Sequence, residues 1–571
     1  MSTSRLARIT AGVAGAAAVV TVLTLATRLL GFGRWFAQNA WVGPNEIGTA
    51  YATANIVPNV LFEVAAGGAL AGAIVPVLAG AIAKDLRGDV DRTSSALLTW
   101  ALVALVPLGA LTWLAAPAIM RAMLGGGAAA AQVDLGASLL RMFALQIPLY
   151  GVGVVLSGVL QAHRRFIGPA LAPLLSSVVV IGAYYAYGLL TADGVTPATL
   201  TPQAVAWLGW GTTAGVAALS LPLLVPAWRA GVRLRLTLRF PPGVARRARS
   251  LALAGAGGLL AQQLSVLVVA RLANGSGGAG VININQYATA VVMLPYAVLA
   301  VPLATTLFPR LAEHASTGRH DLLAARTATS TRAIVAVSLA GAAALVAAAW
   351  RIEGVFELFA RGGAVEGMGV SIAAAALSVL GLALLFHLAR VLFALERGRL
   401  VLVATSAGWL LVALLALVLV ATSGGGAVAV LRSLGLATSI GTLAGGVLLA
   451  LFIRREVGSP ALAGVARTTA VALAGAVVGA LAGLGVAGLD GGGLAADLGI
   501  GAAAGLVALG VTGGVLALGD RQLLRVVLRR RAPAAAPQAV PAPTAPTATT
   551  ATTTPPPTVA APGTPDGDER P

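Results

Sequence analysis

The chain has 571 residues, of which 58% are hydrophobic and 10% are charged, and its formal net charge is +18. An average soluble domain contains about 25% charged residues, so this composition excludes an ordinary soluble protein. The sequence contains no cysteine and four scattered histidines, which argues against disulfides and metal chemistry, and its basic residues form no aromatic-rich basic domain for nucleic acid.

Apolar runs of about 20 residues recur along the sequence, which is typical of membrane-spanning helices. We therefore predict an all-α polytopic membrane protein with about fourteen transmembrane helices, in two parallel six-helix lobes plus two extra helices. The predicted spans lie in the runs 12–40, 50–83, 94–120, 136–162, 168–190, 204–228, 250–273, 282–309, 330–350, 368–392, 400–421, 428–453, 463–488 and 493–518. Arg5 and Arg8 before the first run also fit a signal peptide, but the length of that run favours a retained helix.

The loops between these runs alternate in charge. About thirty of the 38 basic residues fall in every second loop, and this bias predicts the cytoplasmic side of the membrane. Arg351 and Arg361 are the main basic residues in loops predicted to lie outside. The pattern predicts a multi-pass membrane protein with both termini in the cytoplasm.

Two pairs of segments resemble each other six spans apart, which predicts a parallel repeat. The first pair is VPNVLFEVAAGGALAGAIVPVLA, which contains Pro58, and LPYAVLAVPLATTLFPRLA, which contains Pro295. The second pair is GVLQAHRRFIGPAL and RVLFALERGRLVLV. The alternative is chance similarity among helices rich in Ala, Leu and Gly. The repeat predicts an N-terminal lobe (1–228), a basic cytoplasmic linker (229–249), a C-terminal lobe (250–456), two additional spans (457–519) and a disordered, Pro/Thr/Ala-rich cytoplasmic tail (520–571).

Polar residues within the second span form a stripe. Asn55, Asn59 and Glu63 are four residues apart, so they share one helical face, and Pro58 predicts a kink beside them. A polar face in a membrane helix has to contact protein or a water-filled cavity. The stripe therefore predicts part of a substrate cavity, and helix–helix adhesion is the alternative.

Two arginines end the first apolar run. Arg28 and Arg34 are separated by about 120° and about 9 Å on a straight helix, so a shared cavity requires a wide space or a bend. Gly31 and Gly33 make such a bend easy. The alternatives are that Arg34 extends to the outer surface and that Arg28 pairs with Glu63.

The eighth span carries a second polar face with Asn285 and Thr289, which we also predict to line the substrate cavity, and Pro295 predicts another kink. Arg390 lies near the inner end of the tenth span, where extension toward the membrane surface is expected. The sequence lacks a nucleotide-binding G-x-x-x-x-G-K-[ST] motif and any hydrolytic constellation, so we predict that the protein is not an enzyme and uses no cofactor or metal.

Three blocks of sequence carry a resemblance to a known family. The first block is TRLLGFGR with AYATANIVPN and GGALAGAIVPVL, the second is SGVLQAHRRFIGPALAPLLSS, and the third is YATAVVMLPYAVLAVPLATTLFPRLAEHA. Together they resemble the MurJ/MviN lipid II flippases of the multidrug/oligosaccharidyl-lipid/polysaccharide exporter superfamily. The likeness covers about residues 20–400. It implies a two-lobed flippase that moves lipid II, the undecaprenyl-pyrophosphate-linked peptidoglycan precursor, from the inner to the outer leaflet by alternating access.

The resemblance also implies roles for residues. Arg28 and Arg34 match the family's two first-helix arginines and would attract the pyrophosphate, and Glu63 would pair with one of them in one conformation. Many members have Asp where this chain has Thr49 and Arg where it has Phe62. Many also have Glu at the position of Gly67 and Arg at the position of Ala290. Rival hypotheses are a transporter of another polyprenyl-linked glycan, a multidrug or cation antiporter of the superfamily, and a membrane scaffold that recruits wall-synthesis or division proteins through its tail.

Overall fold

The computed structural model describes residue 23 and residues 26–64, 71–241 and 244–521. Every regular element in these segments is a helix, which confirms the predicted all-α membrane architecture. The predicted disordered tail lies almost entirely outside the described residues, as does the first part of the first predicted span.

The first lobe begins with a helix over residues 26–41. It continues with α2 (Glu46–Phe62), α3 (Ala71–Ala83), α4 (Arg87–Leu124), α5 (Ala130–Phe143), α6 (Gln146–Ala162), α7 (Ile167–Leu189), α8 (Pro202–Ser220), η2 (Leu221–Leu223) and α9 (Leu224–Arg229). The second lobe contains α10 (Val244–Gly277), α11 (Val281–Pro295), η3 (Tyr296–Ala300), α12 (Val301–Ser316), α13 (His320–Glu357), α14 (Met368–Ala375), α15 (Ser378–Ala394), α16 (Gly398–Thr422) and α17 (Ala427–Val457). The chain then forms η4 (Ser459–Leu462), α18 (Val465–Ala487) and α19 (Leu494–Gly519).

The described residues contain 10 helical segments that are long and apolar enough to cross a membrane, or 11 if α14 and α15, bent by 40°, form one span. Three of the predicted runs, 12–40, 50–83 and 250–273, are not among them. Each of these runs includes residues that the structure does not describe in full. The total of about fourteen spans therefore stays a prediction.

The two lobes repeat the same pattern of elements. Helices α4 and α13 occupy matching places and each has 38 residues. The turns that follow α6 and α15 each place a non-glycine residue at positive φ, Arg164 at 58° and Glu396 at 60°. This conformation is uncommon outside glycine, so its recurrence at the two segments that resemble each other in sequence supports the parallel repeat. The exact domain boundaries stay a prediction.

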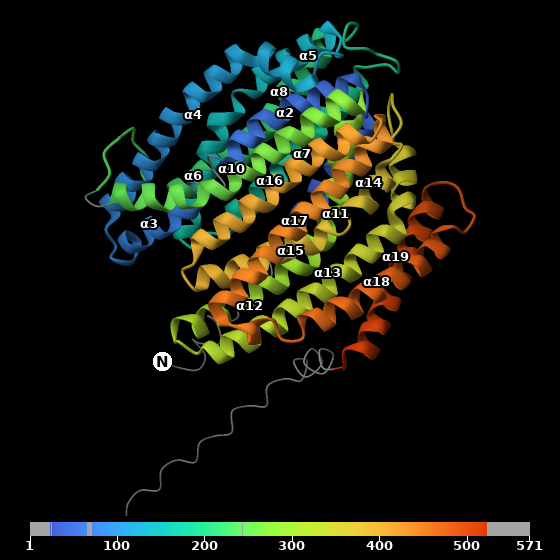
Figure 1. Ribbon diagram of the computed structural model, residues 1–571. Helices are drawn as coiled ribbons and strands as arrows, with labels where there is room; N and C mark the ends of the chain where they lie inside the picture. The colour runs from blue at the N-terminus through green and yellow to red at the C-terminus, as the bar shows by residue number, and fades with distance from the viewer. Residues whose placement is uncertain (1–22, 24–25, 65–70, 242–243, 522–571) are drawn as a thin grey trace, which may run out of the picture. The chain divides into compact units, whose positions relative to one another are not determined.

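Helices α2 and α10 lie between the lobes. Helix α10 packs along α16, as Figure 1 shows, and also contacts α2, α3 and α4, whereas α11 contacts α2. Among the helices from α2 onward in the described residues, these are the substantial helix–helix contacts between the lobes. Tyr51 and Ala54 of α2 pack in a first-lobe cluster, while Ile56 and Val60 pack in a second-lobe cluster. The polar stripe of α2 is therefore carried by a helix that both lobes hold.

The last two helices form a hairpin against α13. The Thr512 hydroxyl of α19 donates to the Gly475 carbonyl of α18 at 3.1 Å, and small residues allow the two backbones to approach. An ion pair of 2.8 Å joins Arg351 of α13 to Asp497 of α19, and Arg351 also donates to the Ala487 carbonyl at 2.8 Å. These contacts fix the hairpin to the second lobe.

The basic linker is held on α4. Residues 232–240 are not helical, and alternate backbone N–H groups donate to side chains four residues apart on α4. The pairs are Arg233 with Asp91 at 2.9 Å, Arg235 with Ser95 at 3.0 Å and Thr237 with Thr99 at 3.1 Å. Two extended residues and four helical residues both span about 6 Å, so the two periods match. The basic residues of the linker further predict contact with anionic lipid headgroups.

Candidate functional site

The first helix, residues 26–41, packs its aromatic residues against the second lobe. Phe32, Trp35 and Phe36 contact the apolar cluster of α11, α13 and their neighbours. The ring centroids of Phe36 and Phe356 are 4.2 Å apart, and those of Trp35 and Tyr287 are 6.1 Å apart. The aromatic stripe fixes the rotation of the helix and therefore decides where its arginines point.

Arg34 lies over the ring of its neighbour Trp35, with the guanidinium carbon 5.5 Å from the ring centroid. It is half-buried and interacts electrostatically with Tyr51, Tyr150 and Tyr184. The hydroxyl groups of Tyr51 and Tyr184 are hydrogen-bonded at 2.8 Å. Arg34 has no carboxylate partner within the described part of the chain, so its charge is not neutralised by an ion pair there.

Arg28 lies six residues before Arg34 on the same helix. Its side chain is exposed and interacts electrostatically with Tyr296, and it too has no ion pair among the described residues. The helix is continuous through Gly31 and Gly33, and a Cβ at either glycine would meet no heavy atom within 4 Å. The two arginines thus interact with tyrosines of different lobes. Bending at the two glycines stays a prediction.

The polar stripe of α2 meets Tyr150 of α6. The Tyr150 hydroxyl donates to Asn59 Oδ1 at 3.0 Å, and Tyr150 also interacts electrostatically with Glu63 and Arg34. Asn59 is exposed, whereas Asn55 and Glu63 are half-buried. Tyr150 therefore connects the stripe to the first-helix arginine. The structure has no ion pair between Glu63 and Arg28 within the residues it describes.

The two predicted kinks lie beside irregular turns. Helix α2 continues through Pro58 to Phe62, and residues 63–64 are π-helical. Helix α11 ends at Pro295, and the π-helical turn η3 follows directly. π-Helical turns leave backbone groups less regularly bonded and are frequent at functional sites. Movement at these prolines stays a prediction.

The predicted polar face of α11, Asn285 and Thr289, makes no side-chain hydrogen bond to the first lobe among the described residues, and its place in the cavity stays a prediction. Thr289 is exposed and donates to the Asn285 carbonyl of its own helix at 2.7 Å. Sequence reasoning missed the residue two positions earlier, Asn283, whose amide donates to the Gly48 carbonyl of α2 at 3.2 Å. It also missed Asn274 of α10, which donates to the Thr53 hydroxyl at 2.9 Å. Both are asparagines near predicted outer ends of spans, which is the signal that could have indicated them.

Glycines let backbones of the two lobes meet at this end. The Gly280 N–H donates to the Thr49 hydroxyl at 2.7 Å, and a Cβ at Gly280 would overlap the Pro44 carbonyl oxygen. A Cβ at Gly43 would overlap the Arg361 carbonyl oxygen. Both glycines have positive φ, 81° at Gly43 and 83° at Gly280, which glycine adopts without strain. Backbone-to-backbone contact of this kind requires glycine at both positions.

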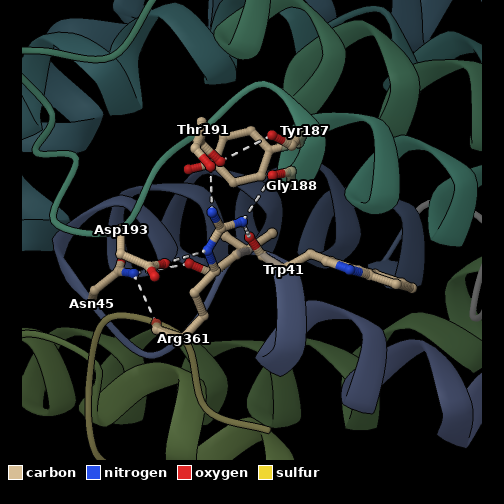
Figure 2. A network of polar contacts seen from close by, with 8 residues as sticks. Trp41, Asn45, Tyr187, Gly188, Thr191, Asp193 and Arg361 are labelled. Carbon is tan, nitrogen blue, oxygen red and sulfur yellow. Dashed lines mark hydrogen bonds and ion pairs between the residues drawn. The ribbon is translucent and has the colours of Figure 1, made fainter.

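Arg361, in the segment between α13 and α14, extends the contact across the lobes (Figure 2). Its guanidinium donates to the carbonyl oxygens of Gly188 at 3.1 Å, Trp41 at 3.3 Å and Thr191. It also pairs with Asp193 at 3.2 Å, although the Asp193 side chain is 91% exposed. Three backbone acceptors in fixed positions make Arg361 the main polar link between the two lobes at this end.

Asn45 connects this link to α2. Its Oδ1 accepts from the Gly48 N–H at 2.9 Å and so caps the helix, while its amide donates to the Arg361 carbonyl at 3.3 Å. Asn39 of the first helix donates to the Phe356 carbonyl of α13 at 2.7 Å. We call the contacts of Arg361, Gly43, Thr49, Asn274, Gly280 and Asn283 the interlobe contact. It lies at the end of the helices that the charge pattern predicts to be outside.

The sequence profile of the family described as lipid II flippase MurJ matches residues 39–491. The chain belongs to the MurJ family. The match includes α2, the interlobe contact and nearly all of the second lobe.

Curated MurJ proteins are similar to parts of the chain. A probable lipid II flippase MurJ of Rhizobium tropici is 28% identical over 302 residues, which is 52% of this chain and 54% of that protein. The lipid II flippase MurJ of Burkholderia cenocepacia is 28% identical over 318 residues, 53% of this chain and 58% of that protein. The chain thus spans a little over half of the length of these curated relatives.

Solved structures share the fold. A lipid II flippase MurJ in an inward closed conformation covers 89% of this chain with a TM-score of 0.68 at 16% identity, and 99% of that structure is matched. An inward-facing multidrug resistance MATE transporter covers 78% of this chain with a TM-score of 0.62 at 16% identity, and 98% of it is matched. An outward-facing MATE structure gives a TM-score of 0.54 at 16% identity over 77% of this chain and 96% of that structure.

Positions at which the chain departs from many MurJ sequences have local explanations. Thr49 accepts the Gly280 N–H in the interlobe contact, and the Phe62 ring lies 4.3 Å from that of Tyr150. Ala290 is half-buried on α11, and Gly67 lies outside the described residues. The first lobe therefore places an aromatic pair where many members place an arginine.

Proposed function

We propose that this chain is a lipid II flippase that moves the undecaprenyl-pyrophosphate-linked precursor from the inner to the outer leaflet of the bacterial cytoplasmic membrane by alternating access. Its membership of the MurJ family supports this function. The single observation that carries the proposal is that Arg28 and Arg34 have no ion-pair partners among the described residues and interact electrostatically with tyrosines of different lobes.

A pyrophosphate fits this arrangement chemically. A guanidinium group binds phosphate oxygens through two parallel hydrogen bonds and keeps its charge in a poorly solvated space. An unpaired arginine within a membrane protein costs a few kcal/mol or more, and an anionic substrate offsets that cost while it is bound. Outward movement of each negative charge is favoured by about 2.3 kcal/mol per 100 mV of inside-negative potential.

The interlobe contact supports an inward-facing state. The polar contacts between the lobes gather at Arg361, Asn274 and Asn283, near the loops that contain few basic residues. The chain is also more similar to the inward-facing than to the outward-facing MATE structure. In the proposed cycle, the headgroup enters from the cytoplasmic side, and the interlobe contact then opens to release it outside. Both termini are cytoplasmic in this orientation.

Depletion and rescue test the proposal. The unaltered chain is expressed in a bacterium whose own lipid II flippase is depleted, and lipid II in the outer leaflet is labelled with an impermeant reagent. We expect growth and outer-leaflet labelling to be restored. Normal membrane insertion without any restored labelling would contradict the proposal. Restored transport of a different polyprenyl-linked glycan, with lipid II unmoved, would show that the chain carries that glycan instead.

A further inference from the structure

Arg390 of α15 lies within the second lobe, and the sequence predicted that its side chain extends toward the membrane surface. The side chain contacts aromatic rings instead. Its guanidinium carbon is 3.9 Å from the centroid of the Phe386 ring and 5.8 Å from that of Phe308 on α12. Its Nη1 is buried and has no hydrogen-bond partner among the described residues. Two aromatic faces therefore hold the charged group between α12 and α15.

Tyr296 connects Arg390 to the first helix. The Tyr296 ring meets the Phe386 ring edge-on at 6.1 Å, and Tyr296 interacts electrostatically with both Arg390 and Arg28. Tyr296 is the first residue of the π-helical turn η3. Phe386 thus contacts both Tyr296 and Arg390.

Neither cation is balanced by the protein. No Asp or Glu in the described segments forms an ion pair with Arg390 or Arg28. Cation–π contact with phenylalanine stabilises a guanidinium by only about 0.5–2 kcal/mol, which is less than the cost of holding it unpaired in a membrane. Aromatic contact orients Arg390 without removing its charge, and one of its donors is left unused.

We propose that Arg390, together with Arg28 and Tyr296, forms a second-lobe contact for the pyrophosphate of the lipid-linked substrate. This inference rests on the proposed function and adds a residue to its binding site. Arg34 and Tyr150 contact the headgroup on the first-lobe side, and Arg390 supplies donors on the other side. A pyrophosphate has enough oxygen atoms and charge to use both sets of donors, whereas a monophosphate engages one set.

Binding to the purified full-length chain tests the inference. The chain is placed in nanodiscs, and dissociation constants are measured for undecaprenyl pyrophosphate and undecaprenyl phosphate. Loss of a charged hydrogen bond weakens binding by about tenfold or more, so we expect Arg390→Gln to weaken pyrophosphate binding by about tenfold and monophosphate binding much less. Arg390→Lys keeps the charge but not the paired donors, so its pyrophosphate affinity should be intermediate.

Arg310→Gln is the matched control, because Arg310 lies on α12 two residues after Phe308 and is exposed. We expect its affinities to equal those of the unaltered chain. A merely structural role for Arg390 would lower the affinity for both ligands equally and would overturn the inference. Unchanged pyrophosphate binding by Arg390→Gln would also overturn the inference about Arg390. The proposed function would still stand in that case if the unaltered chain rescues the depleted strain. Failure of the unaltered chain both to bind pyrophosphate and to rescue would overturn both.

Discussion

The Arg361 guanidinium donates a hydrogen bond of 3.1 Å from Nη1 to the carbonyl oxygen of Gly188. The bond joins the segment between α13 and α14 of the second lobe to the end of α7 in the first lobe. Because the acceptor is a backbone carbonyl, the bond depends on the position of α7 and not on the identity of a side chain. It is therefore a sensitive marker of whether the lobes are closed at this end.

Substitution of Arg361 should favour opening of the interlobe contact. Arg361→Gln removes a charged donor from three carbonyls, and each such bond contributes about 1.5–3 kcal/mol. The chain has no native cysteine, so Asn283→Cys, at a site that is 0% exposed, reports on opening by thiol labelling from outside. We expect labelling to rise at least about tenfold when Arg361→Gln is added.

Asp193→Asn is the control for this test. The Asp193 side chain is 91% exposed, so its ion pair with Arg361 contributes at most about 1 kcal/mol. Labelling at Asn283→Cys should change little when this variant is added. Equal labelling with Arg361→Gln and with Asp193→Asn would mean that Arg361 does not hold the lobes together.

Gly43 should be intolerant of any side chain. Its φ is 81°, and a Cβ there would overlap the Arg361 carbonyl oxygen. Gly424 has a similar φ of 77° but would meet nothing within 4 Å. We expect Gly43→Ala to abolish rescue of a flippase-depleted strain and Gly424→Ala to retain it. Loss of rescue in both variants would attribute the effect to backbone strain rather than to contact between the lobes.

Asn59 should be accessible from one side of the membrane. It is exposed beside Tyr150, whereas Asn283 in the interlobe contact is buried. Asn59→Cys should react with an impermeant thiol reagent in inside-out vesicles and resist it in intact cells, and Asn283→Cys should resist it in both. Reaction of Asn59→Cys only from outside would contradict the inward-facing interpretation.

The ion pair between Arg351 and Asp497 should stabilise the α18–α19 hairpin. Its side chains are only 17% and 13% exposed, and loss of one partner from a mostly buried pair costs about 3 kcal/mol. The matched control is the pair of Arg87 with Asp85, whose side chains are 88% and 84% exposed. In thermal unfolding of the purified protein, Arg351→Gln should lower the midpoint clearly and Arg87→Gln should change it little. Similar midpoints would show that the hairpin does not need this pair.

The fold was predictable because membrane helices depend on apolar length, and the repeat was predictable because Pro58 and Pro295 recur in similar segments. The polar stripe of α2 was also visible, since Asn55, Asn59 and Glu63 share one helical face. Such signals are local in sequence. The number of spans and the roles of these residues remain predictions.

The interlobe contact was not predictable in the same way. Arg351 and Arg361 stood out only as exceptions to the charge bias of the loops. The structure gives each a partner far away in sequence, Asp497 for Arg351 and the Gly188 carbonyl for Arg361. Periodicity does not report such pairings, because a carbonyl acceptor leaves no trace in the side-chain pattern. The direction of Arg390 was missed for the same reason, since its aromatic partner Phe308 lies on another helix.

The central claim is that the first-helix arginines, which have no ion-pair partner in the described part of the chain, bind an anionic lipid headgroup. Transport of lipid II by the purified chain in proteoliposomes tests it most directly, with Arg34→Ala beside the exposed control Arg319→Ala. We predict that the unaltered chain and Arg319→Ala move lipid II across the bilayer, that Arg34→Ala does not, and that Arg34→Lys is intermediate. Equal transport by Arg34→Ala and the unaltered chain would contradict the account.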